Sequence, residues 1–224
     1  MIRSRALLTS ALLEFVSGLF VSGALLFGSA GTFAYAQAWL FLVLLFVPLL
    51  ALGAALFLKA PELLVRQLQI GARDDARQRV VTLSGMLFLC VFVFAGTDFR
   101  IGWSTVPVWL IAFASIALLL ACALYAQTLR EDARLLHSGT QRGQQVIDTG
   151  LHGVVRHPTY AAMILLFLSI PLVLGSFVAF AVMLLYPPLI AACIVKEEKH
   201  LVHRLPGYAD YQKRVKYRLI PFVW

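Results

Sequence analysis

Long apolar stretches alternate with short polar segments along this 224-residue chain. Because a helix needs about 20 apolar residues to cross a hydrocarbon core of roughly 30 Å, four of these stretches predict membrane-spanning helices. They are residues 6–27, 39–58, 80–94 or slightly beyond, and 107–129. Two further apolar segments, 160–174 and 176–195, flank a Gly-Ser turn signal and predict a helical hairpin. The pattern indicates an all-α fold, a polytopic membrane helix bundle of four spans and a C-terminal helical hairpin.

Polar segments and prolines subdivide this pattern. Leucines alternate with polar side chains after Pro61, so the basic loop 59–79 is predicted to carry an amphipathic segment on the membrane surface. Residues 98–103 predict a short exit turn after the third span, and Pro187-Pro188 is expected to break the second arm of the hairpin. We expect a transmembrane bundle over 1–130 and a second region over 131–224, with a polar segment 144–160, the hairpin 160–195 and a polar tail 196–224.

Composition narrows the class of protein. Hydrophobic residues make up 61% of the chain and charged residues 13%, far from the averages of soluble domains. The net charge of +8 raises the possibility of nucleic-acid binding, but the Lys and Arg residues lie in loops beside the spans, so no nucleic-acid partner is expected. Cys90, Cys122 and Cys193 lie within apolar runs, without the close Cys/His pairing of a metal site, and no metal is expected.

The distribution of positive charge predicts the orientation. If the spans alternate, the basic segments that fall on one side are Arg3 with Arg5, 59–79, 130–142 and 196–218. The other side has only Arg100. Because basic loops stay in the cytoplasm, we expect a multi-pass integral membrane protein with both termini cytoplasmic, in the inner membrane if the source is bacterial.

Glu14 is an ionisable side chain inside the first predicted span. It shares a helix face with Ser10, Gly18 and Ser22 at steps of four residues, a small and polar stripe typical of a helix–helix interface. An acid within a span is a candidate functional residue. Alternatively, Arg5 is near enough in sequence to satisfy Glu14 close to the membrane interface.

The most informative polar segment begins the last hairpin, with the sequence Arg156-His157-Pro158-Thr159-Tyr160. Proline suits the first position of a helix, so this segment should lie at a helix N-terminus, where free N–H groups attract anions. About forty residues later, at the end of the return helix, the chain carries Lys196-Glu197-Glu198. The hairpin should bring these two polar ends together.

The ordered set of these motifs and the tail resembles the isoprenylcysteine carboxyl methyltransferase family of membrane enzymes. The tail residues that carry the resemblance are Tyr208, Tyr211, Arg214, Tyr217, Arg218 and Pro221. The match covers about 144–221, a third of the chain. The resemblance implies a methyltransferase that uses S-adenosylmethionine, bound on the cytoplasmic side by the region 131–224, with a lipophilic or lipidated molecule as methyl acceptor.

The resemblance also implies roles for particular residues. The cofactor-binding residues would be Gln144, Gln145, Val146, Ile147, Gly150, Leu151, His152, His157, Pro158, Thr159, Tyr160 and Glu197. The catalytic residues would be Arg156, His157, Tyr160, Glu197 and Glu198. The chain departs from the family at His152, where the family usually has Tyr, and at Cys193, where the prenylcysteine enzymes have an Arg that holds the substrate carboxylate.

These features lead to an expectation about the acceptor. We expect its apolar body to reach the site sideways from the bilayer, between Tyr186 on the return helix and Glu14 on the first span. Glu14, Tyr186 and Cys193 are therefore the candidate substrate-binding residues, and membrane lipids are expected partners. Since Cys193 replaces the arginine, a neutral, amine or thiol end group is as reasonable as a carboxylate.

Other interpretations stay open. A phospholipid N-methyltransferase would differ only in its acceptor, and sterol or steroid reductases resemble the same C-terminal region but bind NADPH. A scaffold or carrier is a third possibility. Each residue also has a purely structural explanation: His157 as a satisfied interfacial histidine, Glu197 and Glu198 as a helix end paired with neighbouring lysines, and the tail tyrosines as headgroup anchors.

Overall fold

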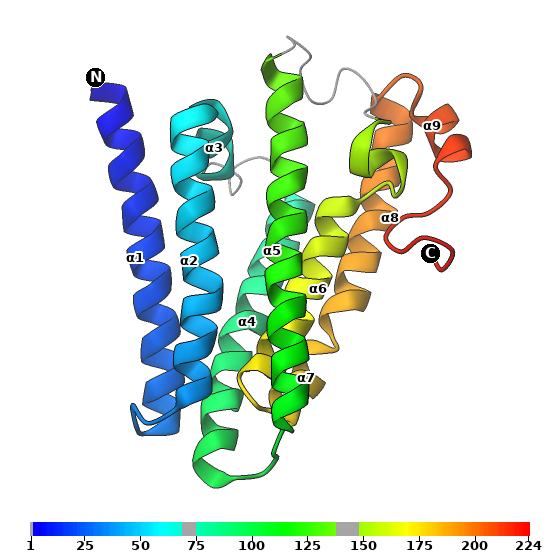
Figure 1. The fold of residues 1–224 in the computed structure, drawn as a ribbon. Helices are drawn as coiled ribbons and strands as arrows, with labels where there is room; N and C mark the ends of the chain where they lie inside the picture. Colours follow the sequence, from blue (N-terminus) through cyan, green and yellow to red (C-terminus); the bar gives the residue numbers. More distant parts are fainter. Residues whose placement is uncertain (1, 69–74, 138–147) are drawn as a thin grey trace.

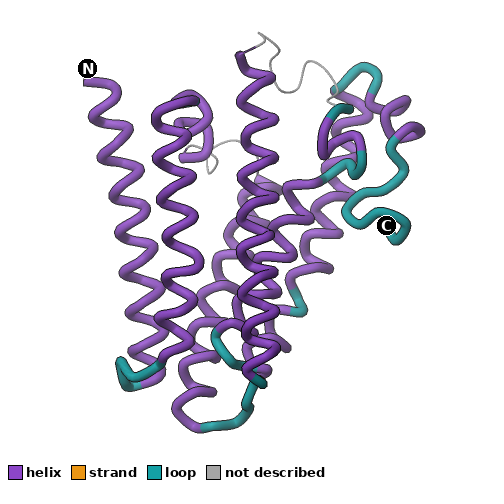
Figure 2. Tube along the Cα trace, viewed as in Figure 1, coloured by secondary structure: helices purple, strands orange, loops and turns teal. Residues whose placement is uncertain are grey.

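The computed structural model describes residues 2–68, 75–137 and 148–224 (Figure 1). The described residues are helical or in turns and loops, with no strand among them (Figure 2). The elements are α1 (Ile2–Ala30), α2 (Ala36–Lys59), α3 (Pro61–Leu68), α4 (Asp75–Ile101), α5 (Val108–His137), η2 (Gly150–Gly153), α6 (Pro158–Val173), α7 (Phe177–Met183), α8 (Tyr186–Arg204) and α9 (Tyr208–Arg214). The predicted all-helical fold is confirmed.

Five segments among the described residues are long and apolar enough to cross a membrane. They are Leu7–Ala30, Ala36–Lys59, Thr82–Ile101, Val108–Glu131 and Phe177–His203. The first four match the predicted spans, and the fifth is the second arm of the hairpin, which combines α7 and α8. The first arm, Pro158–Val173, is shorter at 16 residues. By length and apolar composition, the chain is a multi-pass membrane protein.

Local differences from the sequence prediction have physical causes. The predicted exit turn at 98–103 is wrong at its start, because α4 continues to Ile101 before the chain turns at Gly102, which adopts a φ of +74°. The predicted break near Pro187-Pro188 is present: α7 ends at Met183, and α8 begins with the prolines in its first turn. A proline costs little at that position, because the first N–H groups of a helix have no internal partner.

The helices run along a common direction, with the N-terminus at one end of the bundle and the last residues of the tail beside α8 (Figure 1). The same end carries the α2–α3 connection, the last turn of α5 and the C-terminal tail. Helix α1 packs against α2 and α4, while α5 packs against α6 and α2. Most of the charged segments therefore share what we term the charged end, and the turns near 31–35, 102–107 and 174–176 form the opposite end.

A buried acid organises the opposite end. Asp98 near the end of α4 is 1% exposed, and its carboxylate accepts hydrogen bonds from Ser176 Oγ and from both the backbone N–H and Oγ of Ser104. Ser176 is also the N-cap of α7 and accepts from Ala179 N at 3.0 Å. Nearby, Tyr35 donates to the Leu174 carbonyl. These bonds fix the turn between α6 and α7 to α4.

Helices α1 and α4 cross closely at Gly96. A Cβ atom added there would lie 2.7 Å from the Leu26 carbonyl and would also collide with the Ser29 hydroxyl. In the structure, Ser29 Oγ occupies this space and donates a hydrogen bond to the Leu25 carbonyl at 2.6 Å. The absence of a side chain at Gly96 therefore sets the distance between the two helices, as small residues do at many membrane helix interfaces.

We predict that Gly96→Ala destabilises the protein by about 1–3 kcal/mol, because the added methyl group overpacks the α1–α4 contact. Thermal or denaturant unfolding in detergent measures this. Gly85→Ala on the same helix is the control, since a Cβ at Gly85 meets nothing within 4 Å. The control should be neutral or stabilising by up to about 1 kcal/mol; equal losses in both variants would contradict the packing explanation.

Candidate active site

The segment before α6 is held against the C-terminal tail. Arg156 N donates to the Tyr217 carbonyl and His157 N donates to the Arg218 carbonyl, both at 2.9 Å. Glu198, near the end of α8, bonds to Arg156 in this segment and to Arg218 in the tail. The predicted meeting of the Arg156–Tyr160 segment with the end of the return helix is therefore present in the structure.

Glu198 is the centre of this arrangement. Its side chain is 5% exposed, and Oε1 accepts from Arg156 Nε at 2.7 Å and lies 3.3 Å from His157 Nε2. Oε2 accepts from Arg218 Nε at 2.9 Å. Because a carboxylate is only an acceptor, the proton of His157 is assigned to Nε2. Both oxygens of Glu198 are therefore used by groups of the protein itself.

Arg156 is satisfied in the same way. Besides Glu198, it donates from Nη1 to the carbonyls of Val215 at 2.8 Å and Lys216 at 3.1 Å. Its side chain is 7% exposed. A guanidinium that bridges a carboxylate and two backbone carbonyls locks α8 to the tail. The geometry gives Arg156 and Glu198 the role of positioning the neighbouring groups.

A second hydrogen-bonded pair, Tyr160 and Glu197, joins α6 to α8, and Glu197 directly precedes Glu198. The Tyr160 hydroxyl donates to Glu197 Oε2 at 2.8 Å, and the Tyr160 hydroxyl oxygen also lies 3.7 Å from Cys193 Sγ. Glu197 is only half-buried. Among the described residues, its other oxygen, Oε1, has no hydrogen-bonding partner. Glu197 thus retains an acceptor that a bound molecule can reach.

The first turn of α6 adds donors next to this acceptor. Pro158 occupies the first position of the helix, after His157 as N-cap. Among the described residues, no carbonyl accepts from the N–H groups of Thr159 and Tyr160. Such N–H groups and the helix dipole favour an anion. The site therefore combines anion-binding donors on α6 with a partly free carboxylate on α8.

The short helix η2 is attached to α5 by Glu131, a residue that the sequence analysis missed. Leu151 N donates to both carboxylate oxygens of Glu131 at 3.3 Å, and His152 Nδ1 lies 3.5 Å from Oε2. Gly150 has a φ of +61°, and a Cβ there would lie 2.5 Å from Glu131 Oε1. No local pattern reveals this contact, because Glu131 lies where the apolar stretch of α5 ends and its partners lie 20 residues later in the chain.

Tail residues complete the support for η2. The Tyr211 hydroxyl donates to the His152 carbonyl at 2.7 Å, and burial raises the pKa of Tyr211 to about 12, so the hydroxyl stays protonated. Arg214 pairs with Asp148 at 2.7 Å. The sequence analysis noted Tyr211, Arg214 and Arg218 as parts of the tail motif but did not assign their contacts. Tyr211 and Arg214 each contact a partner more than 50 residues earlier in the chain, and only the folded structure brings these partners together.

The structure does not bring all the candidate residues together. Glu14 is exposed on α1, which packs against α2 and α4. Tyr186 is buried in the core at 2% exposure and stacks on Phe167 with ring centroids 4.4 Å apart. Of the candidate substrate-binding residues, Cys193 is the one that contacts the Tyr160–Glu197 pair. Gln144, Gln145, Val146 and Ile147 lie outside the described residues.

Comparisons of this chain with protein-family models, with curated proteins and with solved structures find no match. The chemistry that the site can support is therefore inferred from the groups that it contains. These are two backbone donors on α6, the carboxylate of Glu197, the phenol of Tyr160 and the thiol of Cys193.

We predict that Glu198→Ala releases the C-terminal tail and destabilises the protein by about 3–5 kcal/mol, because it leaves the guanidinium of Arg156 buried without its counterion. Unfolding in detergent and limited proteolysis at 205–224 measure the two effects. Asp210→Asn is the control, since the pair of Asp210 with Lys213 is exposed and a surface pair contributes little. A tail that stays protease-resistant in Glu198→Ala would rule out this role.

Proposed function

We propose that the protein is a membrane methyltransferase that uses S-adenosylmethionine and methylates a lipophilic acceptor. The observation that supports this best is the pairing of Tyr160 with Glu197 at the N-terminus of α6. There, donors for an anion and an acceptor for hydroxyl or ammonium groups lie on facing helices. The motif resemblance over 144–221 points to the same function.

The groups present fit the polar parts of S-adenosylmethionine. Its amino-acid carboxylate suits the N–H groups of Thr159 and Tyr160, and its ammonium or ribose hydroxyls suit Glu197 Oε1. When bound, this molecule supplies an electrophilic methyl group on a sulfonium. Methyl displacement needs an aligned acceptor and the exclusion of water more than it needs an acid or base.

The residues of the site divide into two roles under this proposal. Glu197, Tyr160 and the first turn of α6 contact the donor. Arg156 and Glu198, whose polar atoms are already bonded within the protein, hold α6, α8 and the tail in register. Cys193 lies beside Tyr160, and its uncharged thiol cannot clamp a carboxylate as an arginine does. The acceptor therefore has no need of an anionic end group at this position.

We also propose that the charged end faces the cytoplasm. Among the described residues, the basic segments lie at this end, and the opposite end has Arg100 as its only basic side chain. Basic segments are retained on the cytoplasmic side. This orientation gives the site direct access to a donor that is made in the cytoplasm.

We predict that purified protein binds S-adenosylhomocysteine, the product that remains when the donor has lost its methyl group. Glu197→Gln should weaken this binding by about 1–3 kcal/mol, because a hydrogen bond to a charged group is lost. Isothermal titration calorimetry measures both affinities. Glu62→Gln, at an exposed acid on α3, is the control and should bind like the unchanged protein.

The same titration separates the proposal from a reductase. NADP⁺ is titrated in parallel with S-adenosylhomocysteine. Tight binding of NADP⁺ without binding of S-adenosylhomocysteine would favour the reductase interpretation. Equal affinity of the Glu197→Gln variant and the unchanged protein for S-adenosylhomocysteine would remove Glu197 from the binding site.

The orientation has its own test. In a background without native cysteines, Thr32→Cys at the opposite end should react with a membrane-impermeant maleimide from outside intact cells, and Glu62→Cys should react only after permeabilisation. Both positions are exposed. Labelling of Glu62→Cys from outside would reverse the proposed orientation.

A further inference from the structure

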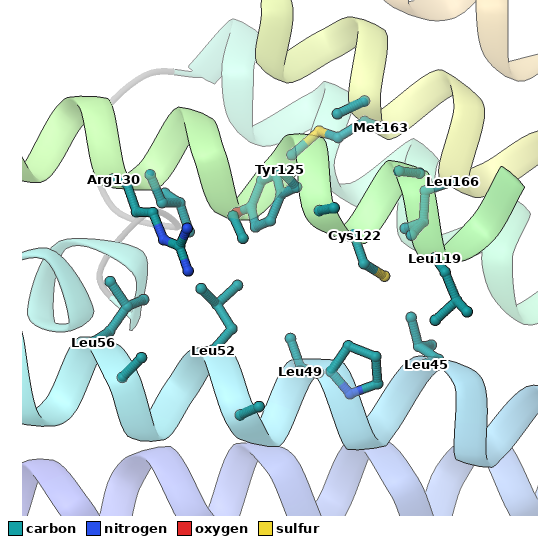
Figure 3. A pocket seen from close by; sticks show the side chains of 18 of the residues that line it. Leu45, Leu49, Leu52, Leu56, Leu119, Cys122, Tyr125, Arg130, Met163 and Leu166 are labelled. Atoms are coloured by element: carbon teal, nitrogen blue, oxygen red, sulfur yellow. The ribbon is translucent and has the colours of Figure 1, made fainter. Parts of the chain in front are cut away.

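A large apolar cavity lies between α2, α5 and α6. Its volume is about 920 Å³, near the upper end of the range for small-molecule pockets. Leu45, Leu49, Leu52 and Leu56 of α2 face Leu119, Cys122 and Tyr125 of α5 across it, with Met163 and Leu166 of α6 behind (Figure 3). Tyr160, Glu197, Glu14, Tyr186 and Cys193 are not among its lining residues. The cavity is therefore distinct from the site proposed for the methyl donor.

The cavity is long enough to hold an acyl chain. Its lining runs along α2 from Leu45 to Lys59, about 21 Å at 1.5 Å per residue, and over the same length of α5 from Leu119 to Ala133. One leaflet of a bilayer contributes roughly half of a 30 Å hydrocarbon core. Leu49 and Leu119 remain 44% and 42% exposed. An acyl chain can therefore lie along these helices from outside the bundle.

The charges at the cavity specify the end group. Lys59 and Arg130 are the charged side chains of its lining, and both lie toward the charged end of the bundle. In Figure 3, Arg130 lies toward one end of the cavity, on α5 across from Leu52 and Leu56 of α2. Among the residues that the structure describes, no carboxylate forms a salt bridge with either cation. Both are free to pair with an anion at the membrane surface.

We propose that this cavity binds a membrane lipid with an anionic headgroup. One acyl chain fills the apolar space between α2, α5 and α6, and Lys59 and Arg130 pair with the headgroup. A neutral apolar molecule would fit the walls but would leave two cations without partners. The site recognises the lipid by its charge and chain, independently of methyl transfer at Tyr160 and Glu197.

The test uses the protein in phosphatidylcholine nanodiscs with a trace of phosphatidylglycerol that carries a photoreactive diazirine in its acyl chain. A phosphatidylcholine probe with the same chain is used in parallel, and crosslinked peptides are mapped by mass spectrometry. We expect the anionic probe to label α2 and α5 peptides several-fold more than the neutral probe. Lys59→Gln and Arg130→Gln should each reduce that capture about five-fold.

Three further variants keep the test decisive. Lys199→Gln removes an exposed cation of α8 that does not line the cavity, and it should leave capture unchanged. Ala126→Phe fills the cavity without changing a charge and should reduce capture of the anionic probe, while Ala112→Phe, elsewhere on α5, should not. Equal capture of the two probes, or undiminished capture in both Lys59→Gln and Arg130→Gln or in Ala126→Phe, would overturn the proposal.

Discussion

A carboxylate removed from water needs compensating donors, and Glu198 obtains them from two distant segments of the chain. Arg156 and His157 precede α6, Arg218 comes from the tail, and the acid itself projects from α8. Without that carboxylate, the Nε–H groups of Arg156 and Arg218 and the ring N–H of His157 would have to find other acceptors. The folding of the C-terminal region around the end of the hairpin therefore depends on this one acid.

The opposite end of the hairpin is fixed by a network of different chemistry. Among the described residues, Asp98 pairs with no cation, and it is satisfied by hydroxyl and amide donors of Ser104 and Ser176. This holds the α6–α7 turn to α4, while Glu198 holds the beginning of α6 to α8 and the tail. Because both ends of α6 are anchored, the orientation of its first turn is set by the whole bundle.

Much of the fold follows from local pattern. Span length, Pro158 at a helix start and Pro187-Pro188 at a break are properties of short windows, and the structure has them where the sequence predicts them. The contacts of Glu131, Asp98 and Tyr211 were missed, because each depends on a partner brought close only by tertiary folding. The cavity was missed for the same reason: its leucines and alanines look like any lipid-facing helix.

The two arginines on Glu198 differ in their contact with water. The side chain of Arg156 is 7% exposed, whereas that of Arg218 is 32% exposed and also lies over the Trp224 ring, 5.0 Å from its centroid. Dissolved ions screen exposed pairs far more than buried ones. Rising ionic strength therefore weakens the outer attachment of the tail first and leaves the inner attachment at Arg156 intact, so the tail loosens from its distal part inward.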